Sequence, residues 1–304
     1  MAKKMLFLFV LLLSLTGMLK AQVTTAGMSG KVMADEESVI GATVVAVHEP
    51  SGTSYGTVTN VDGRFSLQGM RSGGPYKVTV SYIGYQTAIY TDIQLQLGET
   101  YSLNVTLHEA SELLGEITIT ASKSKFSAEK TGATTNISSE QLTTLPSINR
   151  SISDFTRISP YASGNSFGGR DGRSNTFTVD GANLNNNFGL SSGLPGGGNP
   201  ISLDAIDEVQ VVIAPYDVRQ ANFIGAGINA ITKSGTNAYR GSAYMYFNNE
   251  VMRGNKIGDT DFGARAEESK TVYGATFGGP IIKDKLFFFA NVEYEKSPQQ
   301  VITW

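Results

Sequence analysis

The sequence has no cysteine and only two histidines, His48 and His108, among its 304 residues. Without cysteine the chain cannot form a disulfide, a thiolate metal site or the lipid-modified cysteine of a lipoprotein. Two histidines are too few for a histidine-rich metal site, so we expect no metal and no cofactor. His48 falls near the end of a predicted strand, where we expect a solvated side chain. No nucleophile–base set accompanies it, which argues against an enzyme.

Long apolar runs are scarce as well. The only extended one, residues 5–15, follows Lys3 and Lys4 and is itself followed by small residues. This pattern predicts a signal peptide over residues 1–21, with cleavage after Ala21. A transmembrane helix is the competing interpretation, but a span needs about 20 apolar residues. No comparable run follows, so any membrane insertion must use β-strands.

Charge of one sign is also lacking. The net charge is −3 with 17% charged residues, which gives no reason to expect nucleic acid as a partner. With 40% hydrophobic residues, the chain is too apolar for general disorder. It is rich in glycine, with 34 residues, and in aromatics, with 15 Phe and 13 Tyr. That combination favours turn-rich β-structure over helical bundles, and the predicted fold class is mainly β.

Residues 22–109 form the first mature unit. Apolar and polar residues alternate over 42–47, 76–82 and 101–107, and glycine- or proline-containing turn signals separate these stretches. Short alternating strands at such spacing predict a small β-sandwich.

One turn of this unit carries a specific prediction. The dipeptide Asp62-Gly63 lies between alternating residues 57–59 and 64–67. Asp-Gly flanked by such strands is a strong signal for a β-hairpin, so we expect these two strands to pair.

The next segment, residues 110–125, contains one short alternating stretch. Its six residues are Glu116, Ile117, Thr118, Ile119, Thr120 and Ala121. The two isoleucines would face one side of a strand and the threonines the other. Spacing alone leaves several interpretations open: a last sandwich strand, a first strand of the next unit, or a strand free to add to a partner's sheet.

Residues 126–235 read as an α+β unit. A short helix is predicted from Ser138, which resembles an N-cap, and Pro146 ends it. A second helix is predicted within residues 148–158, with one apolar face formed by Ile152, Phe155 and Ile158. The polar loop 181–200 is either a loosely packed connection or a loop exposed to ligand.

Motifs in the first unit resemble a known family. Residues 30–32, 40–44, 56–65 and 81–85 read GKV, IGATV, GTVTNVDGRF and SYIGY. They resemble the carboxypeptidase-regulatory-like, or transthyretin-like, domain. The resemblance implies an accessory β-sandwich without enzymatic activity.

The second unit resembles the plug domain of TonB-dependent outer-membrane receptors. After an arginine–glycine turn at 169–170, residues 177–181, 206–211 and 225–233 read FTVDG, IDEVQV and GAGINAITK. The resemblance assigns plug-motif positions to Arg170, Asp180, Gly181, Glu208, Gly225, Gly227 and Thr232. Their expected role is to hold plug against barrel, because glycines allow close approach and buried charges need partners. It also favours residues 116–121 as the TonB-box-like coupling strand.

From residue 236 the pattern becomes that of a membrane barrel. Residues 240–247, 271–278 and 286–295 read RGSAYMYF, TVYGATFG and LFFFANVEYE. The connecting turn GPIIKDK, together with the departure APYDVR at 214–219, resembles Oar-like receptors. Three strands are far short of the about 22 of such barrels, and open strand edges are not tolerated in lipid. We therefore expect an N-terminal fragment of a longer receptor.

The resemblance implies an outer-membrane transport receptor whose N-terminal domains lie on the periplasmic side. Expected partners are a TonB-type inner-membrane energy-transducing complex, outer-membrane lipid and an unidentified extracellular ligand, with peptide or protein favoured only by analogy. The alternative is a surface or periplasmic binding protein, or adhesin, in which residues 22–109 bind the ligand and no barrel follows.

Overall fold

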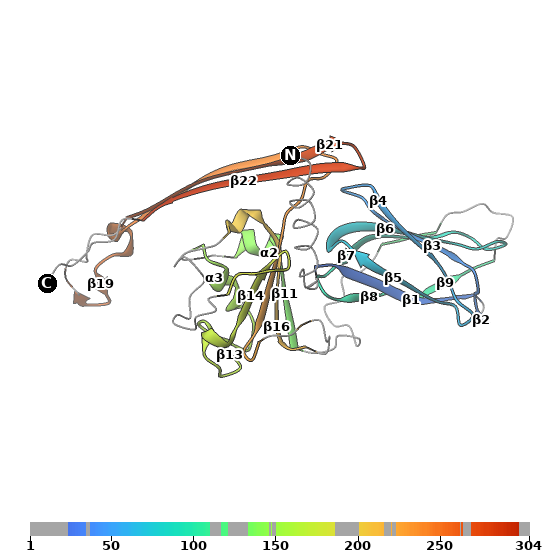
Figure 1. The fold of residues 1–304 in the computed structure, drawn as a ribbon, viewed down its shortest axis with the longest axis horizontal. Coiled ribbons are helices and arrows are strands. Elements are labelled where there is room, and N and C mark those ends of the chain that lie inside the picture. The colour runs from blue at the N-terminus through green and yellow to red at the C-terminus, as the bar shows by residue number, and fades with distance from the viewer. Residues whose placement is uncertain are drawn as a thin grey trace, which may run out of the picture.

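The computed structural model is built almost entirely from β-strands, in three units that follow one another along the chain (Figure 1). It describes residues 24–34, 37–109, 117–120, 133–145, 147, 150–185, 201–215, 220, 223–261, 263 and 269–297. The predicted signal peptide, Glu116, Ala121 and residues 186–200 lie outside this part, as do residues 216–219. No helix in the described ranges is long and apolar enough to cross a bilayer.

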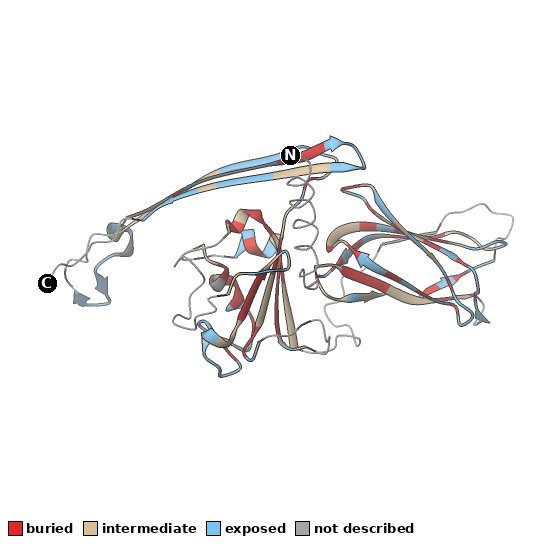
Figure 2. Ribbon diagram, in the orientation of Figure 1, coloured by how far each residue is buried: buried red, intermediate tan, exposed pale blue. Residues whose placement is uncertain are grey.

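The first unit is a β-sandwich, as the sequence predicts. One sheet contains β1 (Ala26–Ala34), β2 (Glu37–Ser38), β5 (Arg64–Met70), β8 (Thr100–Ser102) and β9 (Val105–Leu107). The other has the order β10 (Ile117–Thr120), β7 (Ala88–Leu95), β6 (Gly73–Ser81), β3 (Thr43–His48) and β4 (Thr53–Val58). Alternate side chains point inward, as Phe65 and Leu67 of β5 do, and together they form one apolar core (Figure 2).

The Asp62-Gly63 turn does not close a hairpin, so this prediction was wrong. The strand before it, β4, pairs with β3, whereas β5 pairs with β1 in the opposite sheet. The turn therefore carries the chain from one sheet to the other. The Asn60 side chain accepts hydrogen bonds from the backbone N–H groups of Asp62, at 3.0 Å, and Arg64, at 2.8 Å. A turn dipeptide fixes the local bend, but not which strand the next residues join.

His48 is buried rather than solvated, which corrects the second expectation for this unit. Only 4% of it is exposed, and its Nδ1 lies 2.7 Å from the Ser51 hydroxyl. Its ring lies against Tyr76 with centroids 5.0 Å apart. Burial, assisted by the nearby Arg71 cation, lowers the pKa of His48 to about 4, so the ring is neutral at pH 7. His48 is a core residue of the β3–β4 turn.

The second unit is a mixed five-stranded sheet, called here the central sheet. Its order is β11 (Ala133–Ser138), β16 (Ile206–Ala214), β17 (Gly227–Thr232), β14 (Thr176–Val179) and β15 (Ala182–Asn183). β14 and β17 run parallel and the remaining pairs antiparallel. Strand β16 therefore lies inside the sheet, hydrogen-bonded on both edges, and is buried along most of its length.

Short helices cover the central sheet near the third unit (Figure 1). Helix α2 (Ser139–Thr144) starts at the predicted position, where the Ser138 N–H donates to the Gln141 side chain at 3.1 Å. Helix α3 (Ile152–Thr156) is shorter than predicted: Ile152 and Phe155 are buried, but Ile158 lies beyond its end and is exposed. The smaller elements are β12 (Ala162–Ser163), β13 (Ser166–Phe167), η2 (Gly172–Ser174) and η4 (Leu203–Ala205).

The third unit is a long antiparallel meander of β18 (Arg240–Asn249), β21 (Ser269–Ile282) and β22 (Leu286–Lys296). It covers the three predicted aromatic stretches and lies across the first two units (Figure 1). The connection from β18 to β21 contains η5 (Glu250–Arg253), β19 (Lys256–Ile257) and β20 (Thr260–Asp261). At its other end, the β21–β22 turn meets the sandwich side, where the Asp284 N–H donates to the Asn237 side chain and the Asn237 N–H donates to the Pro50 carbonyl.

Candidate functional site

The three long strands have two chemically different faces. Successive side chains in a strand point to opposite faces, so the strand register assigns every residue to a face. The face turned toward the central unit carries Ser242, Tyr244, Thr276, Asn291 and Glu293. The opposite face carries Ala243, Met245, Ala275, Phe277, Val292 and Tyr294, of which the large side chains are exposed. The face toward the central unit therefore carries most of the polar side chains, with Tyr246, Val272 and Phe289 as apolar members, and the opposite face is mainly apolar.

On the polar face, one residue from each strand forms a row. Tyr244 of β18 lies opposite Gly274 of β21, which in turn lies opposite Glu293 of β22. The tyrosine ring crosses over the glycine, and its hydroxyl donates to the Glu293 carboxylate at 2.6 Å. A Cβ on Gly274 would lie 2.0 Å from Tyr244 Cζ, so only glycine leaves room for the ring.

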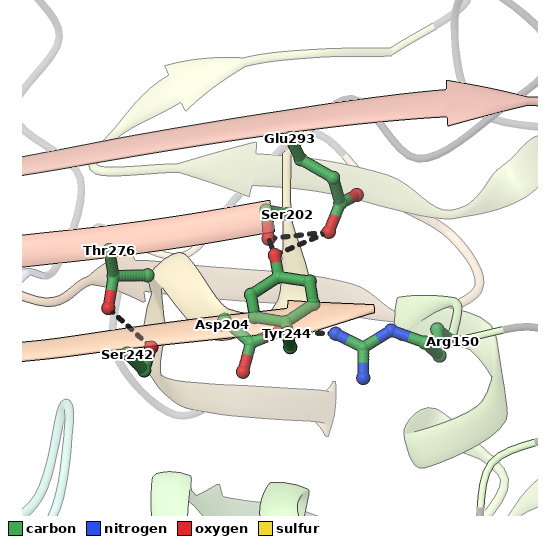
Figure 3. A network of polar contacts seen from close by, with 7 residues as sticks. All are labelled: Arg150, Ser202, Asp204, Ser242, Tyr244, Thr276 and Glu293. Atoms are coloured by element: carbon green, nitrogen blue, oxygen red, sulfur yellow. Dashed lines mark hydrogen bonds and ion pairs between the residues drawn. The ribbon is translucent and has the colours of Figure 1, made fainter. Parts of the chain in front are cut away.

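Ser202, just before η4, joins this row from the central unit. Its hydroxyl donates to the same Glu293 oxygen at 2.9 Å and lies 2.8 Å from the Tyr244 hydroxyl (Figure 3). The carboxylate thus receives two hydrogen bonds, one from its own sheet and one from the central unit. Hydrogen bonds to a charged group are roughly twice as strong as neutral ones.

Arg150 makes a second connection between the same two units. Its guanidinium group forms an ion pair with Asp204 of η4 and lies over the ring of Tyr244, 5.0 Å from the centroid (Figure 3). It also lies over the ring of Tyr246, 3.8 Å from the centroid. The arginine is therefore held by a carboxylate of its own unit and by the aromatic face of β18. We call Arg150, Ser202, Asp204, Tyr244 and Glu293 the polar latch.

A cleft of about 640 Å³ opens beside the latch, between helix α2 and strands β18 and β21. Leu142, Leu203 and Val272 supply apolar lining, and Lys233 and Lys270 supply positive charge. No cluster of three or more metal-ligating side chains is found in the part of the chain that the structure describes.

Asp180 and Thr232, two of the predicted plug-motif residues, meet in the central sheet. The Asp180 carboxylate accepts from the Thr232 N–H at 2.9 Å and from its hydroxyl at 2.7 Å. Asp180 and Gly181 both have positive φ, 48° and 82°, and form the tight turn after β14. This pair clamps the end of β14 to the end of β17, so its observed contacts are internal to the sheet.

The predicted glycines Gly225 and Gly227 permit close packing at the start of β17. A Cβ on Gly225 would lie 2.4 Å from Asn175 Oδ1, and one on Gly227 would lie 2.8 Å from the Phe223 ring. Arg170 ends a different turn, where its N–H donates to the Phe167 carbonyl at 3.0 Å. Its side chain is exposed there.

Glu208 faces the sandwich rather than the long strands. Its two carboxylate oxygens both accept from the Leu97 N–H, at 3.1 Å each, and only 7% of the residue is exposed. Burial is the main cause that raises the pKa of Glu208 to about 8, and the neighbouring carboxylates Asp207 and Glu99 act in the same direction. Much of the Glu208 population is therefore protonated near neutral pH.

The described residues of the predicted coupling strand, Ile117–Thr120, form β10 at the edge of the sandwich. They pair in parallel with β7, from Ile117 opposite Ala88 to Thr120 opposite Thr91. The sequence left three interpretations of this stretch open, and the observed position is that of a last strand of the sandwich. Along its other edge, β10 pairs with no strand in the part of the chain described.

Sequence reasoning missed the polar latch entirely. Arg150 and Ser202 stand next to stretches without regular periodicity, and nothing local marks their partners. One signal was present: Gly274 interrupts an aromatic strand, and a glycine within a strand often marks a close approach by another group. Here the approaching group is the ring of Tyr244.

Comparison with known families defines the class. Residues 27–108 match the carboxypeptidase regulatory-like domain, and residues 231–303 match an outer membrane beta barrel domain. The chain thus combines an accessory β-sandwich with part of an outer-membrane barrel, and the protein is located in the outer membrane.

A curated relative is similar over most of this chain. The TonB-dependent transporter Oar of Myxococcus xanthus is 26% identical over 253 residues, which cover 77% of this chain and 23% of the relative. The chain is similar to this transporter over most of its own length, and it spans about a quarter of the length of that protein.

Solved structures add no further detail. The siderophore receptor PirA from Acinetobacter baumannii shares 23% identity, covers 54% of this chain and 24% of its own, and has a TM-score of 0.40. A type II cohesin–X-dockerin complex from Acetivibrio cellulolyticus shares 20% identity, covers 27% of this chain and 56% of its own, and has a TM-score of 0.23. Both scores are too low to support conclusions about this chain.

Proposed function

We propose that the full-length protein is an energised transporter of the outer membrane. In this proposal the central unit, over residues 126–235, is a plug that closes the barrel begun at residue 236. A TonB-type complex of the inner membrane pulls on residues 116–121 and rearranges the plug. The transported ligand is large, and a peptide or protein is favoured by analogy with the Oar relative alone. No covalent chemistry is part of the proposal.

The observation that carries this proposal is the difference between the faces of β18, β21 and β22. A barrel strand in an outer membrane alternates between lipid and lumen, with apolar residues outward and polar residues inward. Here the polar face holds the central unit through Ser202 and Arg150, as a barrel wall would hold a plug. The apolar face with Met245, Phe277 and Val292 is exposed and suits contact with lipid.

The position of β10 at the edge of its sheet, where no further described strand pairs with it, supports the assignment of residues 116–121 to coupling. A partner strand could add to this edge through backbone hydrogen bonds, which provide affinity with little demand on side chains. Its alternating sequence, Ile-Thr-Ile-Thr, suits such pairing.

The rival function is a binding protein or adhesin in which the sandwich alone binds the ligand. It requires that no barrel follows the sandwich. The match of residues 231–303 to an outer membrane beta barrel domain favours the transporter instead.

The coupling strand can be tested with the full-length receptor in detergent and the periplasmic domain of the cognate TonB-type protein. Replacing Ile117 and Ile119 with proline removes two backbone donors from β10. Loss of two hydrogen bonds of about 1 kcal/mol each should weaken binding at least tenfold, measured by biolayer interferometry.

The matched control replaces Thr118 and Thr120 with alanine, which changes side chains in the same strand but keeps every N–H group. It should bind within about twofold of the parent. Equal affinity of the proline variant and the parent would contradict the assignment of residues 116–121 to coupling.

A further inference from the structure

The sandwich is attached to the central sheet by the turn between β7 and β8. The Leu97 N–H donates to both carboxylate oxygens of Glu208, and the Leu97 carbonyl accepts from the side chains of Gln210 and Asn136. The Leu97 side chain is fully buried. A single backbone position of the sandwich is thus bound on both its donor and its acceptor side by strands β11 and β16.

Gly98 makes this contact possible. It has a φ of +70°, and a Cβ there would lie 2.8 Å from Gln210 Nε2. Next to it, Glu99 accepts a hydrogen bond from the Thr134 hydroxyl of β11 at 3.3 Å. The turn fits the central sheet only because position 98 has no side chain.

Glu208 and Gln210 project toward the sandwich from the middle of β16, and both are almost completely buried. Burying a charged carboxylate would oppose the contact. Burial raises the pKa of Glu208 to about 8, so the neutral form prevails near neutral pH, and the hydrogen bonds to Leu97 define the contact independently of that shift.

The same strand of the sandwich reaches β10 at its other end. β10 pairs with Ala88–Thr91, the first half of β7, and β7 ends at Leu95, two residues before Leu97. β7 is also paired with β6 and contributes Ile93 and Leu95 to the core. One well-packed strand therefore connects the coupling strand to the contact with β16.

We propose that the sandwich is a mechanical connector, in which displacement of β10 passes through β7 and the Leu97 turn to strand β16 in the middle of the plug. This inference rests on the proposed function, because it takes β10 as the strand that is pulled. Residues 121–132 also join β10 to β11 along the chain and lie outside the part that the structure describes. The route through the sandwich runs over hydrogen-bonded strands, and β16 is its point of application.

Two valine substitutions provide a matched test in the full-length receptor. Gly98→Val introduces a side chain at φ +70° against Gln210. Gly69→Val introduces the same side chain at the same φ of +70°, in β5, where a Cβ meets nothing within 4 Å. Both place valine at the same positive φ, and only Gly98→Val pushes the sandwich away from β16.

Ala230→Cys places a thiol in the buried core of the plug, in a full-length receptor whose other cysteines, if any, are replaced with serine. Its maleimide labelling is measured in living cells given tryptone as the source of peptides, with and without a protonophore. In the parent and in Gly69→Val, energised cells should label at least threefold faster than de-energised cells. Gly98→Val should lose most of that difference, while affinity for the TonB-type periplasmic domain stays equal in all three.

If Gly98→Val keeps the full increase in labelling rate on energisation, the mechanical role of the sandwich is refuted while the proposed function stands. A parent with no increment would overturn the proposed function and the connector together. Should Gly98→Val fail to reach the outer membrane, Gln210→Met decides, because it removes the donor to the Leu97 carbonyl and keeps a similar volume. Gln210→Met should also lose the increase in labelling rate on energisation. An unchanged increase would again refute the mechanical role of the sandwich.

Discussion

The central unit is held on two sides by contacts of opposite kinds. Toward the long strands it uses side chains: Arg150 and Ser202 reach across to Tyr244, Tyr246 and Glu293 on a polar wall. Toward the sandwich it grips backbone, since Glu208 and Gln210 bind the N–H and carbonyl of Leu97 in a buried junction. Apart from Ser202, the residues of the latch are only partly buried, so water can reach them. Leu97, Glu208 and Gln210 are almost completely buried, which suits a joint that remains closed.

The largest expected effect comes from filling the space under Tyr244. Gly274→Val would force the ring away from Glu293 and disrupt the latch together with the packing of β18 on β21. Such overpacking typically costs about 3 kcal/mol at the upper end. Hydrogen exchange of the full-length receptor should show lost protection in β18 and η4.

Gly56→Val is the control for this change, because it also adds a valine to a strand glycine but meets nothing within 4 Å. It should leave protection in β18 unchanged. If Gly274→Val left β18 and η4 as protected as Gly56→Val does, Tyr244 would not be positioned by the glycine.

A medium effect is expected from pH at the junction with the sandwich. A carboxyl group whose pKa rises on folding binds more protons in the folded state than in the unfolded state. Its contribution to folding stability is therefore full below about pH 4.5 and is lost as pH rises toward 8. The pKa of the adjacent Asp207 is raised by burial in the same direction. Between pH 6 and 8 the Leu97 N–H should lose roughly 2 kcal/mol of protection against exchange, after correction for its intrinsic rate.

Glu208→Gln keeps an acceptor for Leu97 but does not titrate. Its Leu97 protection should vary much less over the same range, with Asp207 as the remaining titrating neighbour. A wild-type protein with flat protection from pH 6 to 8 would contradict the assignment of a proton to this junction.

The smallest effect should follow from removing one hydroxyl of the latch. Tyr244→Phe keeps the ring over Gly274 and under Arg150 but loses the donor to Glu293. Because Ser202 still donates to that carboxylate, we expect a cost of about 1 kcal/mol, seen as modestly faster exchange in β22. A loss as large as that of Gly274→Val would mean that the hydroxyl, and not the ring packing, holds the latch.

Much of the fold could be predicted from local pattern. The aromatic stretches at 240–247, 271–278 and 286–295 lie within β18, β21 and β22, because alternation and turn glycines are properties of neighbouring residues. The start of α2 at Ser138 is equally local, since a cap needs only the next few residues.

Which strands pair and which side chains meet could not be predicted in the same way. Asp62-Gly63 forms a turn as expected, but the following strand joins the opposite sheet because β1, more than thirty residues upstream, offers its edge. Glu208 was expected to hold plug against barrel, and its observed contact is with Leu97 of the sandwich. His48 was expected in solvent, and Tyr76 of the neighbouring strand β6 packs against its ring. Each of these outcomes depends on residues distant in the sequence, whose approach no local spacing encodes.

The central claim, that the two faces of the long strands meet lipid and lumen, can be measured directly. Single cysteines at Met245 and Ser242 of the full-length receptor in liposomes, each carrying a spin label, report collisions with oxygen from lipid and with a water-soluble nickel chelate. The account predicts that the label at position 245 collides mainly with oxygen and the label at position 242 mainly with the chelate. Equal exposure of both labels to the chelate, or the reverse order, would contradict it.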